Sequence, residues 1–182
     1  MKTLVKGAII GGLVAFIWTN ISWMVLPWHG MTLSTLQNEV PIAESLKSNV
    51  AESGLYILPW SMEHTPEEYE KINKKMEEGP YAFMVVHPNG FKKSMPKMMF
   101  FGLFFNIVIA FILTYLLTKT QGLTYIQKVG FVKMAAVAGA LVILVPNQIW
   151  WQFPMGYTLV TFVDTALTWG FAGLAIGKIV KT

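Results

Sequence analysis

Long runs of apolar residues alternate with polar segments along this chain, and only one of the polar segments is long. About 20 apolar residues in a helix cross the roughly 30 Å of hydrocarbon in a bilayer. The pattern predicts an all-α integral membrane protein, a four-transmembrane-helix bundle with a small external α+β cap between its first two helices. We expect the helices at 1–27, 97–118, 129–146 and 155–182, with Pro146 ending the third.

The first apolar stretch resembles a signal peptide, because Lys2 and Lys6 precede its apolar core. It is longer than a typical signal-peptide core, however, and it has no A-x-A-like cleavage motif. We therefore expect a transmembrane helix that is retained in the protein.

The composition supports a membrane protein and removes several kinds of chemistry. Hydrophobic residues make up 54% of the 182 residues and charged residues only 13%, as in multi-pass membrane proteins. The lack of cysteine excludes disulfide bonds, thiolate metal sites and thiol redox chemistry. The net charge is +4, but the lysines follow the membrane pattern, so we predict no nucleic-acid partner and no cofactor.

The distribution of lysine predicts the orientation in the membrane. Lysines occur at both chain ends and in the polar loop after the second apolar stretch, and none of these regions has an acidic residue. By the positive-inside rule, the termini and the loop 119–128 are cytoplasmic, whereas 28–96 and the interfacial loop 147–154 lie outside. We predict a multi-pass protein of a bacterial cytoplasmic (inner) membrane, with the lipid bilayer as its main partner.

The long polar segment contains signals for a small folded cap. TPEEYEKINKKMEEG is typical of a surface helix, with Thr65 as N-cap, Glu68 completing a capping box and Gly79 as the stop. Glutamates precede lysines by four residues in this helix, which favours i,i+4 ion pairs. Two flanking segments, 54–59 and 80–87, predict paired strands. Before them we expect one or two short helices interrupted at Pro41.

Asp164 is the most informative single residue, because it lies inside the fourth apolar stretch. An intramembrane carboxylate usually faces the bundle interior, pairs with another group or marks a pathway. Counting residues from the outer helix ends puts Asn20, Asn106 and Asp164 at similar depths, with Thr161 on the same face of its helix as Asp164. We hypothesise a polar cluster that binds a ligand. The alternative is a set of interhelical hydrogen bonds with a purely structural role.

Aromatic and metal-binding candidates lie near the outer interface. Trp150 and Trp151 are typical of an aromatic belt, and alternatively they wall a ligand pocket beneath the cap. Four residues, His29, Met31, Met62 and His64, offer imidazole and thioether groups that suit copper(I), although their spacing is not diagnostic.

Small residues indicate where helices approach closely. Gly7 and Gly11 share one face of the first helix, and Gly173 and Gly177 share one face of the fourth. Such faces favour close packing in lipid, either within the chain or against a membrane-protein partner or a second copy.

Together these features predict a non-enzymatic accessory, assembly, lipid-binding or small-molecule-binding protein of the membrane. No nucleophile, zinc-protease, P-loop or dinucleotide motif occurs in the sequence. Two alternatives from other classes stay open: a small membrane enzyme or transporter that uses the Asp164 cluster, and a copper-binding protein.

Overall fold

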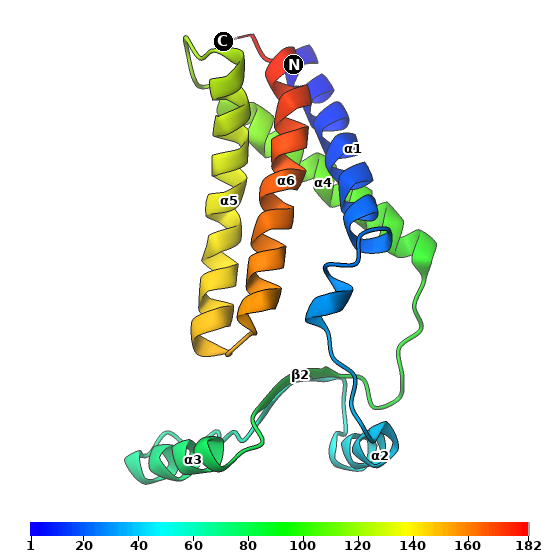
Figure 1. The fold of residues 1–182 in the computed structure, drawn as a ribbon, viewed down its shortest axis with the longest axis vertical. Coiled ribbons are helices and arrows are strands. Elements are labelled where there is room, and N and C mark those ends of the chain that lie inside the picture. The colour runs from blue at the N-terminus through cyan, green and yellow to red at the C-terminus, as the bar shows by residue number, and fades with distance from the viewer. Residues whose placement is uncertain (182) are drawn as a thin grey trace. The chain divides into compact units, whose positions relative to one another are not determined.

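A computed structural model describes residues 1–181, which form two compact units (Figure 1). The helical unit comprises Met1–Ser34 and the chain from Ser94 onward, and the inserted unit comprises Thr35–Lys93. The elements of the helical unit are α1 (Lys2–Met24), the short 3₁₀ helix η1 (Gly30–Thr32), α4 (Met95–Leu117), α5 (Tyr125–Trp150) and α6 (Met155–Ile179).

Four helices of this unit, α1, α4, α5 and α6, are long and apolar enough to cross a membrane, which confirms the prediction of four long apolar helices. The expectation that Pro146 ends the third was wrong, because α5 continues through Pro146 to Trp150. Proline removes one backbone hydrogen bond at its position, but the helical conformation of α5 is maintained on both sides of it.

The start of α5 also differs from the expected position. Thr124 is the N-cap, and its hydroxyl accepts a hydrogen bond from the backbone N–H of Gln127. The side chain of Gln127 in turn accepts from the backbone N–H of Thr124, which completes a capping box. The capping box starts the helix at Tyr125, ahead of the apolar run from which the sequence predicted a start at 129.

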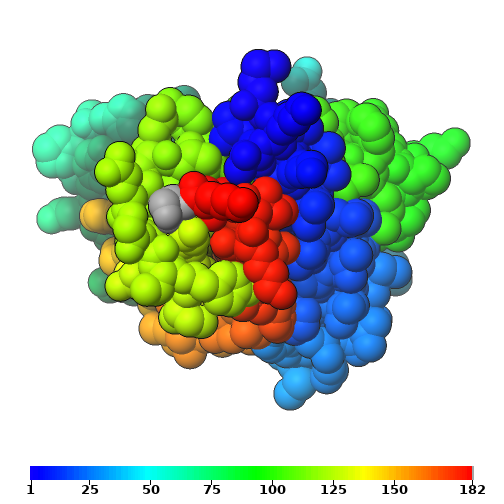
Figure 2. Space-filling model, turned by 90° about the horizontal axis from the view of Figure 1, so that it is seen from above, coloured from blue at the N-terminus to red at the C-terminus, as the bar shows by residue number. Residues whose placement is uncertain are grey.

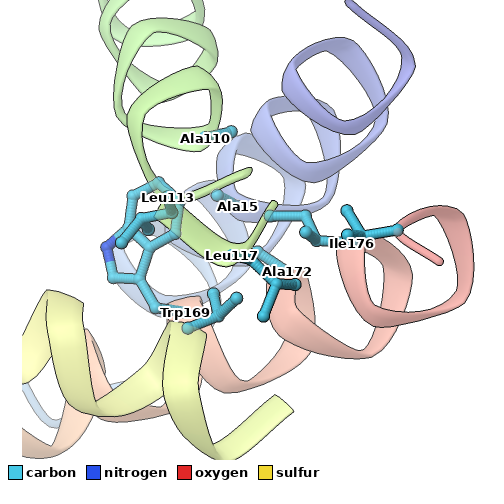
Figure 3. Packing of buried hydrophobic residues seen from close by; sticks show 9 residues of the cluster. Ala15, Ala110, Leu113, Leu117, Trp169, Ala172 and Ile176 are labelled. Atoms are coloured by element: carbon cyan, nitrogen blue, oxygen red, sulfur yellow. The ribbon is translucent and has the colours of Figure 1, made fainter. Parts of the chain in front are cut away.

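The four helices pack in the order α4, α1, α6, α5, with only a slight contact between α4 and α5. Glycine permits a close approach of α1 to α4, because a Cβ on Gly12 would lie 2.6 Å from Cα of Ile107. All four helices contribute to a continuous apolar core, and most of its members are labelled in Figure 3. The core residues are Ala15, Ala110, Leu113, Leu117, Val132, Trp169, Ala172, Ile176 and Val180.

The glycines predicted to form association faces lie against helices of the same chain. Gly7 and Gly11 face α4 and α6, whereas Gly173 and Gly177 face α5. Packing within one chain accounts for these four positions, and association with a partner or a second copy through the same faces stays a prediction.

One end of the helical unit gathers the chain termini and most lysines of the long helices. Figure 2 looks onto this end, with the N-terminal residues in blue, the C-terminal residues in red and the start of α5 in yellow-green. The Lys128 ammonium donates to the Val180 carbonyl at 2.9 Å, and the Tyr125 hydroxyl donates to the Leu174 carbonyl at 3.0 Å. A lysine on the last carbonyls of a helix also complements the helix dipole, so α5 supports the end of α6.

The inserted unit contains α2 (Glu39–Asn49), β1 (Gly54–Leu58), α3 (Pro66–Glu78) and β2 (Ala82–Val86). The predicted strand pair is confirmed, since β1 and β2 are antiparallel with Gly54 opposite Val86. The N-cap of α3 is also confirmed, because Thr65 Oγ1 accepts from the Glu68 N–H at 3.2 Å.

Two details of the inserted unit differ from the predictions. Lys71 pairs with Glu68, three residues before it, instead of with Glu67, since either spacing brings side chains together on a helix. Pro41 does not interrupt a helix but lies in the first turn of α2, where a backbone N–H would lack an intrahelical partner in any case.

Candidate functional site at Asp164

Asp164 is the only acidic residue in the four long helices, and α6 places it at the interface with α1. The residue is only 7% exposed. Its carboxylate is held by two nitrogen atoms: Trp18 Nε1 donates to Oδ1 at 2.8 Å, and His29 Nε2 lies 3.1 Å from Oδ2. Burial of a carboxylate is tolerated only with such partners, so the site depends on Trp18 and His29.

The turn after α1 brings His29 back towards Asp164. The helix ends at Met24, and Pro27 follows within the segment WMVLPWHG. The backbone N–H of Met31 donates to the Pro27 carbonyl, and the η1 helix that begins at Gly30 contacts α6. His29 itself is only 3% exposed and stacks flat on Trp23, with ring centroids 3.8 Å apart.

Ser22 completes the polar network around the imidazole. Its Oγ lies 3.1 Å from His29 Nε2 and accepts a hydrogen bond from Trp28 Nε1 at 3.0 Å. Ser22 is fully buried. A short stretch of the sequence, from Trp18 to His29, therefore supplies both nitrogen atoms that contact the Asp164 carboxylate, together with the serine beside the imidazole of His29.

The combination of serine, histidine and aspartate resembles a catalytic triad in composition but not in geometry. A triad relays a proton because serine and aspartate contact opposite nitrogens of the imidazole. Here Ser22 and Asp164 both contact Nε2 of His29, whereas Nδ1 is buried without a hydrogen-bond partner. The imidazole therefore holds Asp164 in place but is not positioned to pass a proton from Ser22 to it.

A partly open cavity of about 270 Å³ lies beside this network, between α1, α4 and α6. Asp164, His29 and Trp23 form part of its wall. The three helices supply the remaining lining residues, which are mostly threonines: Thr19, Asn106, Ile109, Thr161, Thr165, Thr168 and Trp169. Its volume is close to the lower end of the range for small-molecule pockets, roughly 300 Å³.

The four threonines of this cavity all use their hydroxyl proton in the same way. Each Oγ1 donates to the backbone carbonyl four residues earlier in its own helix, at 2.8–2.9 Å. The hydroxyl oxygens keep their lone pairs, so these side chains present acceptors to the cavity. The residues are Thr19, Thr161, Thr165 and Thr168.

The structure brings together some of the residues predicted from sequence. Asp164, Asn106 and Thr161 line the same cavity. Asn20 is not among the lining residues, and its amide donates to the Phe16 carbonyl of its own helix at 2.7 Å. Trp150 is 74% exposed, and Trp151 lies in the turn after α5; neither belongs to the cavity wall.

The candidate copper ligands occupy different settings. Met31 and Met62 are both strongly exposed. The Nε2 atom of His29 is engaged by Ser22 and Asp164, and Nδ1 of His64 lies 3.2 Å from the Tyr69 hydroxyl. Among residues 1–181, no group of three or more His, Asp or Glu side chains could hold a metal ion.

A second depression lies between α1 and α6 but has a different character. It is an open groove of about 380 Å³, lined by Val14, Ile17, Trp18, Ile21, Phe171 and Leu174. The wall is almost wholly apolar, which suits contact with hydrocarbon. Trp18 belongs both to this groove and, through its N–H, to the Asp164 network.

The sequence hypothesis did not include His29, Ser22 and Trp18 in the Asp164 cluster. One signal for His29 was available: a proline directly after an apolar helix predicts a turn, and the next residues then fold back towards the helix end. Comparison with models of protein families, with curated proteins and with solved structures gave no significant match.

Proposed function

We propose that this protein is a membrane-embedded binding protein whose ligand occupies the cavity beside Asp164. The observation that carries the proposal is the cavity itself, with a buried aspartate–histidine pair and several polar side chains in its wall. Interhelical hydrogen bonds with a purely structural role do not require an empty volume of about 270 Å³ next to them.

Membrane insertion is part of the proposal and is supported by the four long apolar helices. The lysine-rich end of the helical unit supports the orientation with both termini in the cytoplasm. In this orientation Asp164 lies about nine residues, or roughly 14 Å, from the outer end of α6. The cavity is then within reach of the outer aqueous phase and of the outer lipid layer.

The geometry favours binding over catalysis by the same residues. A nucleophilic serine needs a base on its proton and access to substrate, whereas Ser22 is fully buried and already accepts a hydrogen bond from Trp28. The Asp164–His29 pair serves better as a fixed polar wall against which a ligand is oriented.

A matched pair of asparagine substitutions tests the proposal. Asn106 and Asn20 each donate from Nδ2 to the carbonyl four residues earlier, but only Asn106 lines the cavity. Protein purified in mild detergent would be incubated with polar lipid extract and with water-soluble metabolite extract, and bound molecules would be identified by native mass spectrometry.

We expect the unsubstituted protein and Asn20→Phe to retain the same bound molecule, and Asn106→Phe to lose it because the ring fills the cavity. Absence of any bound molecule from the unsubstituted protein would overturn the proposal. Equal retention by Asn106→Phe would also overturn it, since the binding site would then lie elsewhere.

A further inference from the structure

The side chains that line the cavity carry information about the kind of ligand that it fits. We propose, resting on the proposed function, that the ligand presents an organic ammonium group, carried either by a free small amine or by a phospholipid head group. The proposal follows from the hydrogen-bonding roles, the charge and the aromatic content of the wall.

The first step concerns hydrogen-bond donors. Every threonine of the wall has already given its single hydroxyl proton to a backbone carbonyl. Asn106 donates from Nδ2 to the Gly102 carbonyl, which leaves its amide oxygen as an acceptor. Apart from the second N–H of Asn106 and the indole N–H groups of Trp23 and Trp169, a ligand that enters meets oxygen lone pairs, which favour a ligand that supplies N–H or polarised C–H donors.

The second step concerns charge. Asp164 is the only carboxylate on the cavity wall, and no lysine lines it. The one lysine in the middle of a neighbouring helix, Lys133 of α5, lies against Gly170 and not in the wall. His29 is the only titratable partner of Asp164 on the wall. The wall therefore offers a carboxylate to attract a cation and has no lysine to attract an anion.

The third step concerns shape and aromatic surface. Trp23 and Trp169 form part of the wall, and although one face of Trp23 is covered by His29, an ammonium or methylated ammonium group is attracted to an uncovered indole face. A bare alkali-metal ion gains less from such surfaces and needs several oxygens converging at short distance. A volume of about 270 Å³ accommodates a head group of ethanolamine or choline size.

The test asks whether the protein binds an ammonium group, and whether that group belongs to a free amine or to a phospholipid. Ethanolamine and choline chlorides would be titrated against the protein in phosphatidylglycerol nanodiscs by calorimetry, with sodium and potassium chloride at equal ionic strength as controls. Separately, native mass spectrometry would compare retention of phosphatidylethanolamine with that of phosphatidylglycerol. Saturable binding of a free amine indicates an aqueous source, and selective retention of phosphatidylethanolamine alone indicates a lipid source; either result supports the assignment.

Variants identify the site. Asp164→Asn is expected to weaken ammonium binding about tenfold or more, because a charged hydrogen-bond partner is lost. Thr165→Val removes one acceptor with little change in shape and is expected to weaken it about threefold. Thr158→Val is the matched control, because Thr158 also donates to the carbonyl four residues earlier but lies outside the wall. It should bind as tightly as the unsubstituted protein.

Three results would overturn the ammonium assignment. They are the absence of binding by both amines and phosphatidylethanolamine, undiminished binding by Asp164→Asn and Thr165→Val, and saturable binding of sodium or potassium alone. If Asp164→Asn does not fold, the binding of ammonium by Thr165→Val tests the assignment instead. A bound molecule that lacks nitrogen and is lost in Asn106→Phe would overturn this inference while the proposed function stands.

Discussion

The two ends of the helical unit are formed by the same helices but differ in packing. At the lysine-rich end, Gly7 lies against Thr114 and Gly177 against Tyr125, so the backbones approach closely and the core is filled. At the Asp164 end, larger polar and aromatic side chains replace glycine and a cavity of about 270 Å³ remains. Figure 1 shows α1 and α6 close together at the first end and farther apart towards the second.

This difference indicates a division of roles within one set of helices. Small residues provide close contact where stability is needed, because helices in an apolar environment associate through packing. The cavity end is less completely packed, and its buried polar groups require hydrogen-bond partners.

The largest effect is expected from disturbing the close contact between α1 and α4. In Gly12→Leu, the new Cβ would meet the backbone of Ile107 at 2.6 Å, and a backbone cannot move aside as a side chain can. We expect a loss of about 3 kcal/mol in the free energy of unfolding, measured by thermal unfolding in detergent. Gly139→Leu is the control, because a Cβ at Gly139 of α5 meets nothing within 4 Å; an equal loss there would contradict the packing described.

A smaller loss of stability is expected at the cavity end. His29→Leu removes one of the two nitrogen partners of the Asp164 carboxylate and leaves Oδ2 unpaired in a buried position. We expect a loss of about 2 kcal/mol, together with loss of ligand binding, measured by thermal unfolding with and without the ammonium probes. Full stability of His29→Leu would show that the pair does not hold Asp164.

Trp18→Phe should have the smallest effect on stability. The substitution keeps an aromatic ring against Phe171 but deletes the N–H that donates to Asp164 Oδ1. We expect a loss of about 1 kcal/mol, whereas Trp150→Phe, on an exposed ring, should be neutral. If both substitutions have the same effect in chemical unfolding, the Trp18 hydrogen bond contributes nothing specific.

Much of the architecture could be predicted from the sequence, because it depends on local patterns. Apolar runs predicted the four long helices, enrichment in β-branched and aromatic residues helped to predict the strand pair, and Thr65 predicted the start of α3. The continuation of α5 through Pro146 could not be read from the residue type alone, since the effect of proline depends on its surroundings.

The site was only partly predictable, for a geometric reason. Depth in the membrane grouped Asn20 with Asp164, but depth does not specify the direction in which a helix side chain points. Asn20 bonds to its own helix, while Thr19 and Trp23, one turn apart on α1, reach the cavity. His29 reaches it through a turn whose path depends on tertiary contacts with α6.

The measurement that most directly tests a cation-selective cavity at Asp164 uses the lack of native cysteine. Thr165→Cys places one thiol on the cavity wall, and Thr114→Cys places one in the buried contact with Gly7 at the packed end. We predict that an ammonium-bearing methanethiosulfonate labels Thr165→Cys at least about tenfold faster than a sulfonate-bearing reagent of similar size, and that neither reagent labels Thr114→Cys. Equal labelling rates of Thr165→Cys and Thr114→Cys by the ammonium reagent would contradict the account. Faster labelling of Thr165→Cys by the sulfonate would also contradict it.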